Sequence, residues 1–193
     1  RIKSFAGPAV HMDERRQRMV WIDLEMTGLD LEKESIIEIA TVVTDGELNV
    51  LATGPNLAIT VPEELIEGMD DWNTRHHHQS GLVDRIRKEG VSAREAEQAT
   101  LSFLEQWVDR KKAPLCGNSV WNDRQFLGKE MPELLDFLHY RMVDVSTVKE
   151  LARRWYADTP RFQKKGVHLA LDDILESIEE LRHFREHVFV AQD

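Results

Sequence analysis

The stretch Met-Val-Trp-Ile-Asp-Leu-Glu at residues 19–25 decides the fold. It is an apolar run of strand length that ends in two carboxylates. Because side chains alternate along a strand, Asp23 and Glu25 share one face and Leu24 lies on the other. Two like charges so close raise each other's pKa unless a cation lies between them. They are therefore candidate ligands for Mg²⁺, although for Asp-x-Glu alone a solvated strand end is the more frequent explanation.

The rest of the chain predicts strands first, and then helices that alternate with strands. Residues 36–43 are rich in β-branched side chains, Asp45-Gly46 signals a tight turn, and a third, broken strand is expected over 48–51 and 57–61. Helices are predicted at 63–69, after Ser92, at 123–129, from Pro132, at 148–155 and at 169–188, with short strands at 114–116 and 141–144. This order predicts an α/β fold with a mixed sheet flanked by helices.

Two helix starts carry an expected cap. Ser92 and Glu95 match a capping box. Ser146 is expected to cap the helix at 148–155. Ser80-Gly81 marks a loop, and the preceding run of three histidines at 76–78 is also interpreted as a loop.

The composition limits the class of protein. The chain has 193 residues, 41% of them hydrophobic and 31% charged, which fits one domain with a real core. No apolar run approaches the roughly 20 residues that cross a bilayer. Residues 1–18 lack the apolar stretch of a secretory signal. They are expected to be an N-terminal extension, a tag remnant or flexible, before a single domain at 19–193. The one cysteine, Cys116, excludes an internal disulfide and fits a reducing compartment.

The net charge of −10 disfavours binding of long duplex DNA, which relies on Lys and Arg meeting phosphates. Either the substrate is not a nucleic acid, or it is a small one held by few contacts and metal ions. The charge is uneven, since residues 141–165 hold seven Lys or Arg and three acids. A solvated basic face and a phosphate-facing one explain this segment about equally well.

Two further segments place polar residues at the ends of elements. Gly117-Asn118-Ser119 ends a short strand and Asp123 opens a helix, where capping alone explains an Asp. His168 precedes Asp172 and Asp173 at the start of the last helix, where complementing the helix dipole is an equally good explanation.

The three segments together are far more specific than each alone. They place four carboxylates and one imidazole on separate elements. Hydrolysis of a phosphodiester by two metal ions needs such a set, because carboxylates hold the two cations and a base deprotonates the attacking water. A histidine has a pKa that suits this proton transfer near neutral pH.

In this order the segments resemble the exonuclease motifs of the DEDD superfamily, in its His-containing branch. The resemblance narrows to the oligoribonuclease family on the blocks at 21–29, 69–73, 117–119, 139–141 and 144–151. It implies a ribonuclease-H-like fold, a single exonuclease domain, a homodimer and two Mg²⁺ or Mn²⁺ ions. It also implies the 3′-to-5′ release of nucleoside 5′-monophosphates from short single-stranded RNA, dinucleotides especially.

The resemblance also implies the roles of individual residues. The implied metal ligands are Asp23, Glu25, Asp123 and Asp173, and the implied general base is His168. Asp172 is the competitor in the third motif, because in a regular helix a residue four positions after His168 shares its face. The family's His-x-Ala-x-x-Asp pattern selects Asp173.

The implied substrate contacts fall into two groups. Leu29 wedges against a base, while Trp72 and His77 contact bases or sugar, and a core or capping aromatic is the less favoured alternative for Trp72. Ser119, Arg141 and Ser146 surround the terminal phosphate, and Tyr140 reaches in from the second protomer.

Three other interpretations stay open at this point. The first is another DEDD exonuclease, of the proofreading or tRNA-trimming type. The second is a non-catalytic protein that binds dinucleotides, and the third is an adaptor. For the location, the cytoplasm is expected, with mitochondria as the alternative in a eukaryote.

Overall fold

Five strands form one mixed sheet at the centre of the molecule. The computed structural model describes residues 14–163 and 169–190. The strands are β1 (Met19–Met26), β2 (Ile36–Thr44), β3 (Val50–Ala58), β4 (Leu115–Gly117) and β5 (Met142–Asp144). They lie in the order β3-β2-β1-β4-β5. β1, β2 and β3 pair antiparallel in turn, whereas β4 is parallel to β1 and to β5.

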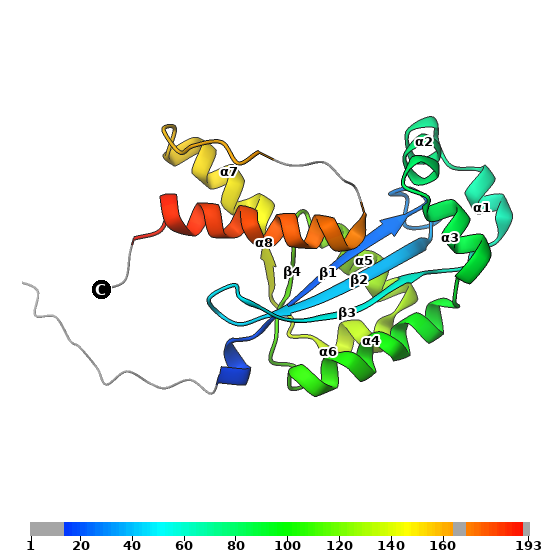
Figure 1. Ribbon diagram of the computed structural model, residues 1–193, viewed down its shortest axis with the longest axis horizontal. Coiled ribbons are helices and arrows are strands. Elements are labelled where there is room, and N and C mark those ends of the chain that lie inside the picture. Colours follow the sequence, from blue (N-terminus) through cyan, green and yellow to red (C-terminus); the bar gives the residue numbers. More distant parts are fainter. Residues whose placement is uncertain (1–13, 164–168, 191–193) are drawn as a thin grey trace, which may run out of the picture.

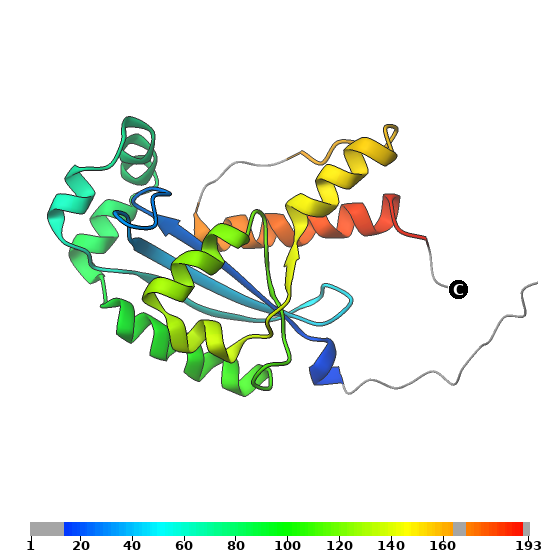
Figure 2. The same ribbon diagram turned by 180° about the vertical axis from the view of Figure 1, so that it is seen from behind.

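Helices cover both faces of this sheet, which confirms the predicted α/β fold (Figures 1 and 2). After the short 3₁₀ turn η1 (Glu14–Gln17), the helices are α1 (Glu63–Glu67), α2 (Asp71–Gln79), α3 (Leu82–Glu89), α4 (Ala93–Trp107), α5 (Trp121–Glu130), α6 (Pro132–Phe137), α7 (Val145–Trp155) and α8 (Ala170–His187). α8 lies across one face, on β1 and β2. α4, α5 and α6 cover the opposite face.

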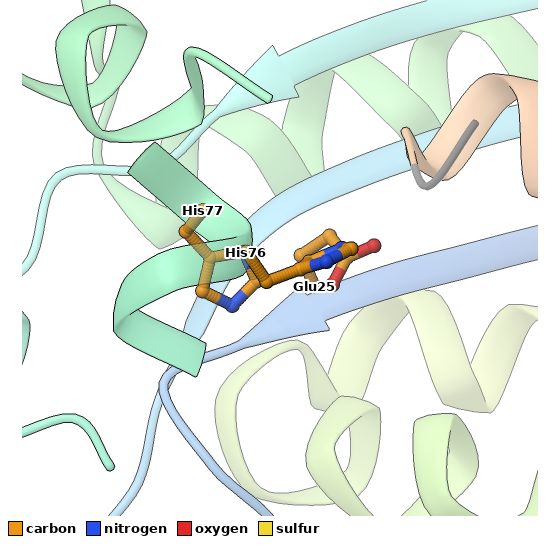
Figure 3. Close-up of side chains that lie close together, drawn as sticks. All are labelled: Glu25, His76 and His77. Carbon is orange, nitrogen blue, oxygen red and sulfur yellow. The ribbon is translucent and has the colours of Figure 1, made fainter. Parts of the chain in front are cut away.

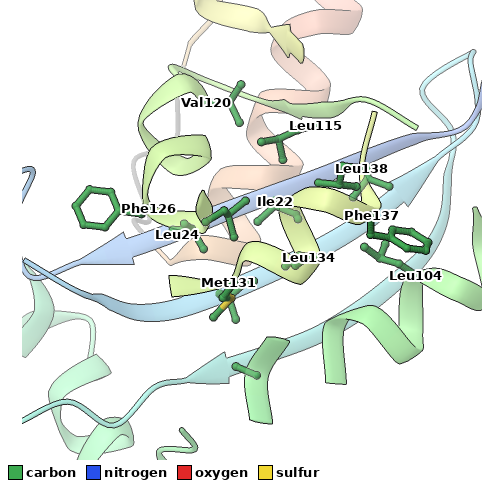
Figure 4. Close-up of a cluster of buried hydrophobic side chains, with 14 of the residues drawn as sticks. Ile22, Leu24, Leu104, Leu115, Val120, Phe126, Met131, Leu134, Phe137 and Leu138 are labelled. Carbon is green, nitrogen blue, oxygen red and sulfur yellow. The ribbon is translucent and has the colours of Figure 1, made fainter. Parts of the chain in front are cut away.

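The alternation of β1 divides its side chains between two cores. Ile22 and Leu24 pack under α4, α5 and α6, beside Phe126 (Figure 4). Trp21 points to the other face, where it packs with Ile174 of α8. Burial of these apolar faces is the main driving force for the fold. It also directs the odd-numbered residues of β1 toward α8, and these include the two carboxylates.

Two helices, α2 and α3, were not predicted. The run of histidines lies inside α2, so its interpretation as a loop is wrong. Asp70 caps this helix by accepting a hydrogen bond from the Asn73 amide at 2.8 Å. Gly81, with a φ of 78°, forms the predicted break and separates α2 from α3. Within α2 only His77 is buried, so the helix lacks the apolar periodicity that sequence analysis relies on.

Two predicted boundaries also need correction. β3 is one continuous strand rather than a broken one, since a proline such as Pro55 is tolerated on an edge strand. α7 begins at Val145, and its cap is Asp144, which accepts a hydrogen bond from the Ser146 amide at 2.9 Å. Ser146 is therefore inside the helix. The capping box of Ser92 and Glu95 is confirmed.

The N-terminal limit of the domain stays a prediction. The guanidinium of Arg18 donates a hydrogen bond to the Trp107 carbonyl at 2.6 Å, so residues just before β1 contact α4. Within residues 14–163 and 169–190, no helix combines the length and the apolar character needed to cross a membrane.

Candidate active site

Three carboxylates from two elements meet above the end of β1. One oxygen from each of Asp23, Glu25 and Asp173 lies within 4.8 Å of the other two. Asp173 belongs to the first turn of α8, which lies over this face of the sheet. Asp172 is exposed and is not part of this group. The structure thus brings together three of the four predicted ligands and places Asp173, not Asp172, beside β1.

Asp123, the fourth predicted ligand, approaches β1 from α5. It is only 6% exposed, and its Oδ1 accepts a hydrogen bond from the Leu24 amide at 3.0 Å. It is not one of the three clustered carboxylates. Its charge nevertheless raises the pKa of Asp23 more than any other neighbouring group does, so it lies close to that side chain. Asp123 therefore adds a further negative charge next to Asp23.

This concentration of negative charge makes the carboxyl groups of the site hard to ionise. Burial, and then the charge of Asp123, raise the pKa of Asp23 well above its ordinary range. Burial, and then Asp173, raise the pKa of Glu25 to about 8. Burial also raises the pKa of Asp123 to about 7, although the Leu24 amide partly opposes this. Full ionisation near neutral pH therefore requires positive charge, and these oxygen donors suit a hard divalent cation.

A further buried carboxylate beside the site was missed by sequence analysis. Glu38 of β2 is fully buried and lies opposite Glu25 in the strand pairing. Arg85 of α3 forms an ion pair with it at 2.5 Å. The Ala170 amide, at the start of α8, donates a longer hydrogen bond to it at 3.4 Å. The only signal in the sequence was a glutamate within the otherwise apolar run at 36–43.

The side chains expected to contact bases lie at the same end of β1, on α2 and on the loop after the strand. Leu29 and Trp72 are 70% and 62% exposed. His77 is buried and its Nε2 lies 3.1 Å from the Met26 carbonyl oxygen. Burial lowers the pKa of His77, and this hydrogen bond partly opposes the effect. The structure thus leaves two apolar surfaces accessible and fixes the histidine to the strand that carries Glu25.

His76 also lies in this region, although the sequence analysis placed it in a loop and gave it no role. Its ring stacks on Trp72, with centroids 4.7 Å apart and an angle of 7° between the planes. One nitrogen each of His76 and His77 and one oxygen of Glu25 lie within 4.8 Å of one another (Figure 3). Residues four positions apart, such as Trp72 and His76, contact each other in a helix. Because this segment was predicted to be a loop, the contact was not expected.

Two serines expected near the terminal phosphate, Ser119 and Ser146, are brought together as a serine pair. Their hydroxyl oxygens lie 3.1 Å apart, and the Ser119 amide donates to Ser146 Oγ at 3.0 Å. Ser119 has a φ of 50°, an uncommon conformation for a residue other than glycine. Arg141 bonds elsewhere in the described chain, as its Nε donates to the Tyr140 hydroxyl at 3.1 Å. His168 lies outside the described residues.

Comparison with known proteins assigns a family to this arrangement. A family model described as "Exonuclease", RNase_T, matches residues 20–181. A protein of Pseudomonas aeruginosa named oligoribonuclease is 59% identical over 172 residues, which cover 89% of this chain and 96% of that protein. One of Alcanivorax borkumensis with the same name is 56% identical over 181 residues, covering 93% of this chain and 100% of that protein.

Solved structures that resemble this one show the fold alone. The zinc-bound exonuclease I of E. coli in complex with single-stranded DNA superposes with a TM-score of 0.72 at 10% identity. Exonuclease I of Methylocaldum szegediense superposes with a TM-score of 0.59 at 19% identity. In both cases the match covers 89% of this chain and 41% of the larger protein.

Proposed function

Because this chain belongs to the RNase_T exonuclease family, among members named oligoribonuclease, we propose that its four carboxylates form the site at which water cleaves the 3′-terminal phosphodiester bond of very short RNAs. The enzyme is a 3′-to-5′ exoribonuclease, a hydrolase that acts on phosphodiester bonds. The proposal adds that dinucleotides are preferred substrates and that the products are nucleoside 5′-monophosphates.

One observation supports the chemistry most directly: Asp23, Glu25 and Asp173 converge within 4.8 Å, and Asp123 lies close enough to raise the pKa of Asp23. An acidic site of this kind repels a phosphodiester unless cations are bound. We therefore propose that these four carboxylates would together hold two divalent cations. Mg²⁺ and Mn²⁺ suit these oxygen donors. When bound, such a pair of cations activates water and neutralises charge at the scissile phosphate.

The remaining residues have assigned tasks in binding and in proton transfer. His168 is the proposed base that takes the proton of the attacking water. Leu29 and Trp72 would flank the bases, where a stacked aromatic contributes about 1–3 kcal/mol. His77, fixed by the Met26 carbonyl, would contact the sugar or base. This assignment directs the 3′ end of the RNA to the carboxylates.

The opposite end of a short RNA would meet the serine pair and Arg141. Two hydroxyls and a guanidinium can surround a phosphate, and the planar guanidinium can pair two of its oxygens. Such an enclosure leaves no room for further nucleotides on the 5′ side. A protein of net charge −10 can then bind RNA through a few enclosed contacts.

A homodimer is proposed to complete this enclosure, with Tyr140 supplied by the second copy. Tyr140 and Trp155 are 69% and 68% exposed. Trp121 and Leu151 line a cavity of about 390 Å³ beside the serine pair. A second copy would cover these apolar side chains. Light scattering should give twice the mass of the chain, and a monomer at micromolar concentration would contradict the assignment. A cytoplasmic location is also proposed, as the named relatives are bacterial and the lone Cys116 is buried.

The decisive experiment is the hydrolysis of a 5′-labelled RNA dinucleotide in the presence of Mn²⁺. A labelled mononucleotide should appear, chelation should stop its release, and added Mn²⁺ or Mg²⁺ should restore it. Labelled single-stranded DNA of matched length and a seven-nucleotide RNA are the comparison substrates. Faster cleavage of the DNA or of the longer RNA would favour another exonuclease of the superfamily. Binding of the dinucleotide without cleavage would favour a non-catalytic binding protein.

A further inference from the structure

Beneath the serine pair lies a buried carboxylate that the proposed chemistry does not use. Glu180 of α8 is 1% exposed. It accepts a hydrogen bond from Asn118 Nδ2 at 3.0 Å and forms an ion pair with Lys149 at 2.9 Å. A carboxylate this deeply buried cannot touch a substrate, so it acts through the groups that it bonds, and of its printed partners Asn118 is the one that contacts the serine pair.

The charge of Glu180 fixes the orientation of the Asn118 side-chain amide. Its Nδ2 donates to Glu180 and also to Ser177 Oγ, at 2.8 Å. Its Oδ1 accepts a hydrogen bond from Ser146 Oγ at 3.0 Å. A flipped amide would turn its oxygen toward the carboxylate of Glu180, and two acceptors would then face each other. The amide oxygen is therefore held toward Ser146.

This orientation decides which serine can donate to a ligand. Because the Ser146 hydroxyl gives its proton to Asn118, its lone pairs are left to accept from the amide and the hydroxyl of Ser119. Asp144 Oδ1 accepts from the amides of both serines at 2.9 Å and holds the loop after β4 against the start of α7. The hydroxyl of Ser119 is then the one that can turn its proton toward a bound phosphate.

α8 connects this network with the carboxylates at its other end. Glu180 follows Asp173 by seven residues, which is two helical turns, so both side chains lie on the same face of α8. The rise between them along the helix is about 10 Å. One rigid element thus fixes the spacing between the proposed metal site and the serine pair.

Building on the proposed function, we propose that Glu180 and Asn118 are positioning residues that hold the serine pair ready to bind the 5′-terminal phosphate of a short RNA. Loss of either should reduce recognition of that phosphate and leave the hydrolytic step intact. A purely structural role would instead slow all substrates alike.

The test compares RNA dinucleotides with a 5′-phosphate and with a 5′-hydroxyl. The wild-type enzyme should prefer the phosphorylated one, and Glu180→Gln and Asn118→Ala should each lower kcat/KM for it by about tenfold or more, the usual effect of losing a bond to a charged group. The 5′-hydroxyl dinucleotide should change by less than about threefold. Ser177→Ala is the matched control, because it removes an acceptor of Asn118 and leaves the charge that orients the amide, so the preference should persist.

The outcomes separate this proposal from the proposed function. An enzyme that cleaves neither dinucleotide refutes the proposed function itself. The remaining outcomes assume that the wild type prefers the 5′-phosphorylated dinucleotide. The positioning role is wrong if a folded Glu180→Gln or Asn118→Ala loses rate equally on both dinucleotides. It is also wrong if such a variant keeps the full preference for the 5′-phosphate. Melting curves identify the folded variants. Asn118→Ala retains the ion pair of Glu180 with Lys149, and it keeps the proposal testable should Glu180→Gln not fold.

Discussion

Glu25 and Glu38 face each other across the antiparallel pairing of β1 with β2, and Arg85 binds the second of these carboxylates from α3. Burial, Asp173 and then Glu38 raise the pKa of Glu25. Arg85 balances the charge of Glu38, so the proposed metal ligand has a negative neighbour that is already paired. Glu38 also accepts the amide of Ala170, which places the start of α8 within reach of the same pair.

Removal of Arg85 should therefore destabilise the protein more than removal of both charges. Arg85→Met leaves Glu38 unpaired inside the protein. Breaking a fully buried pair in this way costs about 3–5 kcal/mol, and the partial exposure of Arg85 reduces that cost. The double variant Arg85→Met with Glu38→Gln should recover part of the lost stability. Urea denaturation measures both, and a double variant less stable than Arg85→Met would contradict this account.

The four carboxylates give the next prediction. Asp23→Ala, Asp123→Ala and Asp173→Ala should each reduce turnover by more than the about 10–100-fold that a change next to metal ligands typically costs. Asp172→Ala is the matched control, because its side chain is exposed next to Asp173 on the same helix. It should keep activity within about threefold of wild type, as expected for a surface change away from the site. Loss of activity in Asp172→Ala but not in Asp173→Ala would reverse the assignment.

The pKa of Glu25 predicts how the stability of the metal-free protein depends on pH. The folded protein keeps a proton on Glu25 up to about pH 8, whereas the unfolded chain releases it near 4.5. The folded state thus binds more protons between these values, and its free energy of unfolding falls as the pH rises through this window. Each pKa unit corresponds to about 1.4 kcal/mol. The contribution is complete below pH 4.5 and is lost above about pH 8.

Denaturation with a chelator present, at several pH values, measures this decline. Glu25→Gln cannot ionise, so its decline should be shallower than that of wild type. Mn²⁺ should stabilise wild type increasingly as the pH rises, because the cation binds the ionised carboxylates. Parallel curves for wild type and Glu25→Gln would show that Glu25 titrates normally.

A prediction on His168 rests on its sequence motif alone. His168→Ala should lower kcat by about 10²–10⁴-fold, the usual contribution of a general base. Binding of Mn²⁺, measured by calorimetry, should change little, because the carboxylates remain. Added imidazole should restore part of the rate. Wild-type activity in this variant across the neutral pH range would exclude His168 as the base.

The sequence predicts that Asp23, Glu25 and Asp173 come together because their placement depends on local rules. Alternation places Asp23 and Glu25 on one face of β1, and α8 begins two residues before Asp172. The burial of Glu38 could not be predicted from its neighbours in the sequence. A charged side chain is buried only with a partner, and that partner, Arg85, lies 47 residues away in the sequence. Likewise, the stacking of Trp72 on His76 requires α2, whose side chains are too polar to reveal a helix by periodicity.

The network around Asn118 shows the same limit at the other end of the site. Asn118 bonds to Ser146 of α7 and to Ser177 and Glu180 of α8, and the serine pair bonds in turn to Asp144 of β5, so no local pattern indicates these contacts. The one local rule applied there, that a serine caps the following helix, selected Ser146. Asp144 takes that role instead, because its carboxylate lies at the end of β5 and accepts the Ser146 amide. The hydroxyl of Ser146 is thereby left for Asn118.

The last prediction concerns Arg141 and the length of the substrate. Arg141 donates to the neighbouring Tyr140 hydroxyl at 3.1 Å, and both side chains are exposed. If Arg141 encloses the terminal phosphate, its loss should matter only for RNAs short enough to reach the enclosure. Arg141→Ala should therefore slow dinucleotide cleavage by about tenfold or more, as expected for a lost bond to a charged group, and slow a seven-nucleotide RNA far less.

Tyr140→Phe separates the two residues in this experiment. It retains the ring that Arg141 packs against, with the guanidinium 5.4 Å from the ring centroid, and removes only the hydroxyl. If Tyr140 serves the partner's site, a monomeric variant such as Trp155→Glu should reproduce the length dependence of Tyr140→Phe, because both remove the same hydroxyl from the enclosure. Rates that fall equally for two, four and seven nucleotides in Arg141→Ala would make Arg141 a general phosphate contact. The preference for short RNA would then have to come from the serine pair and the residues beneath it.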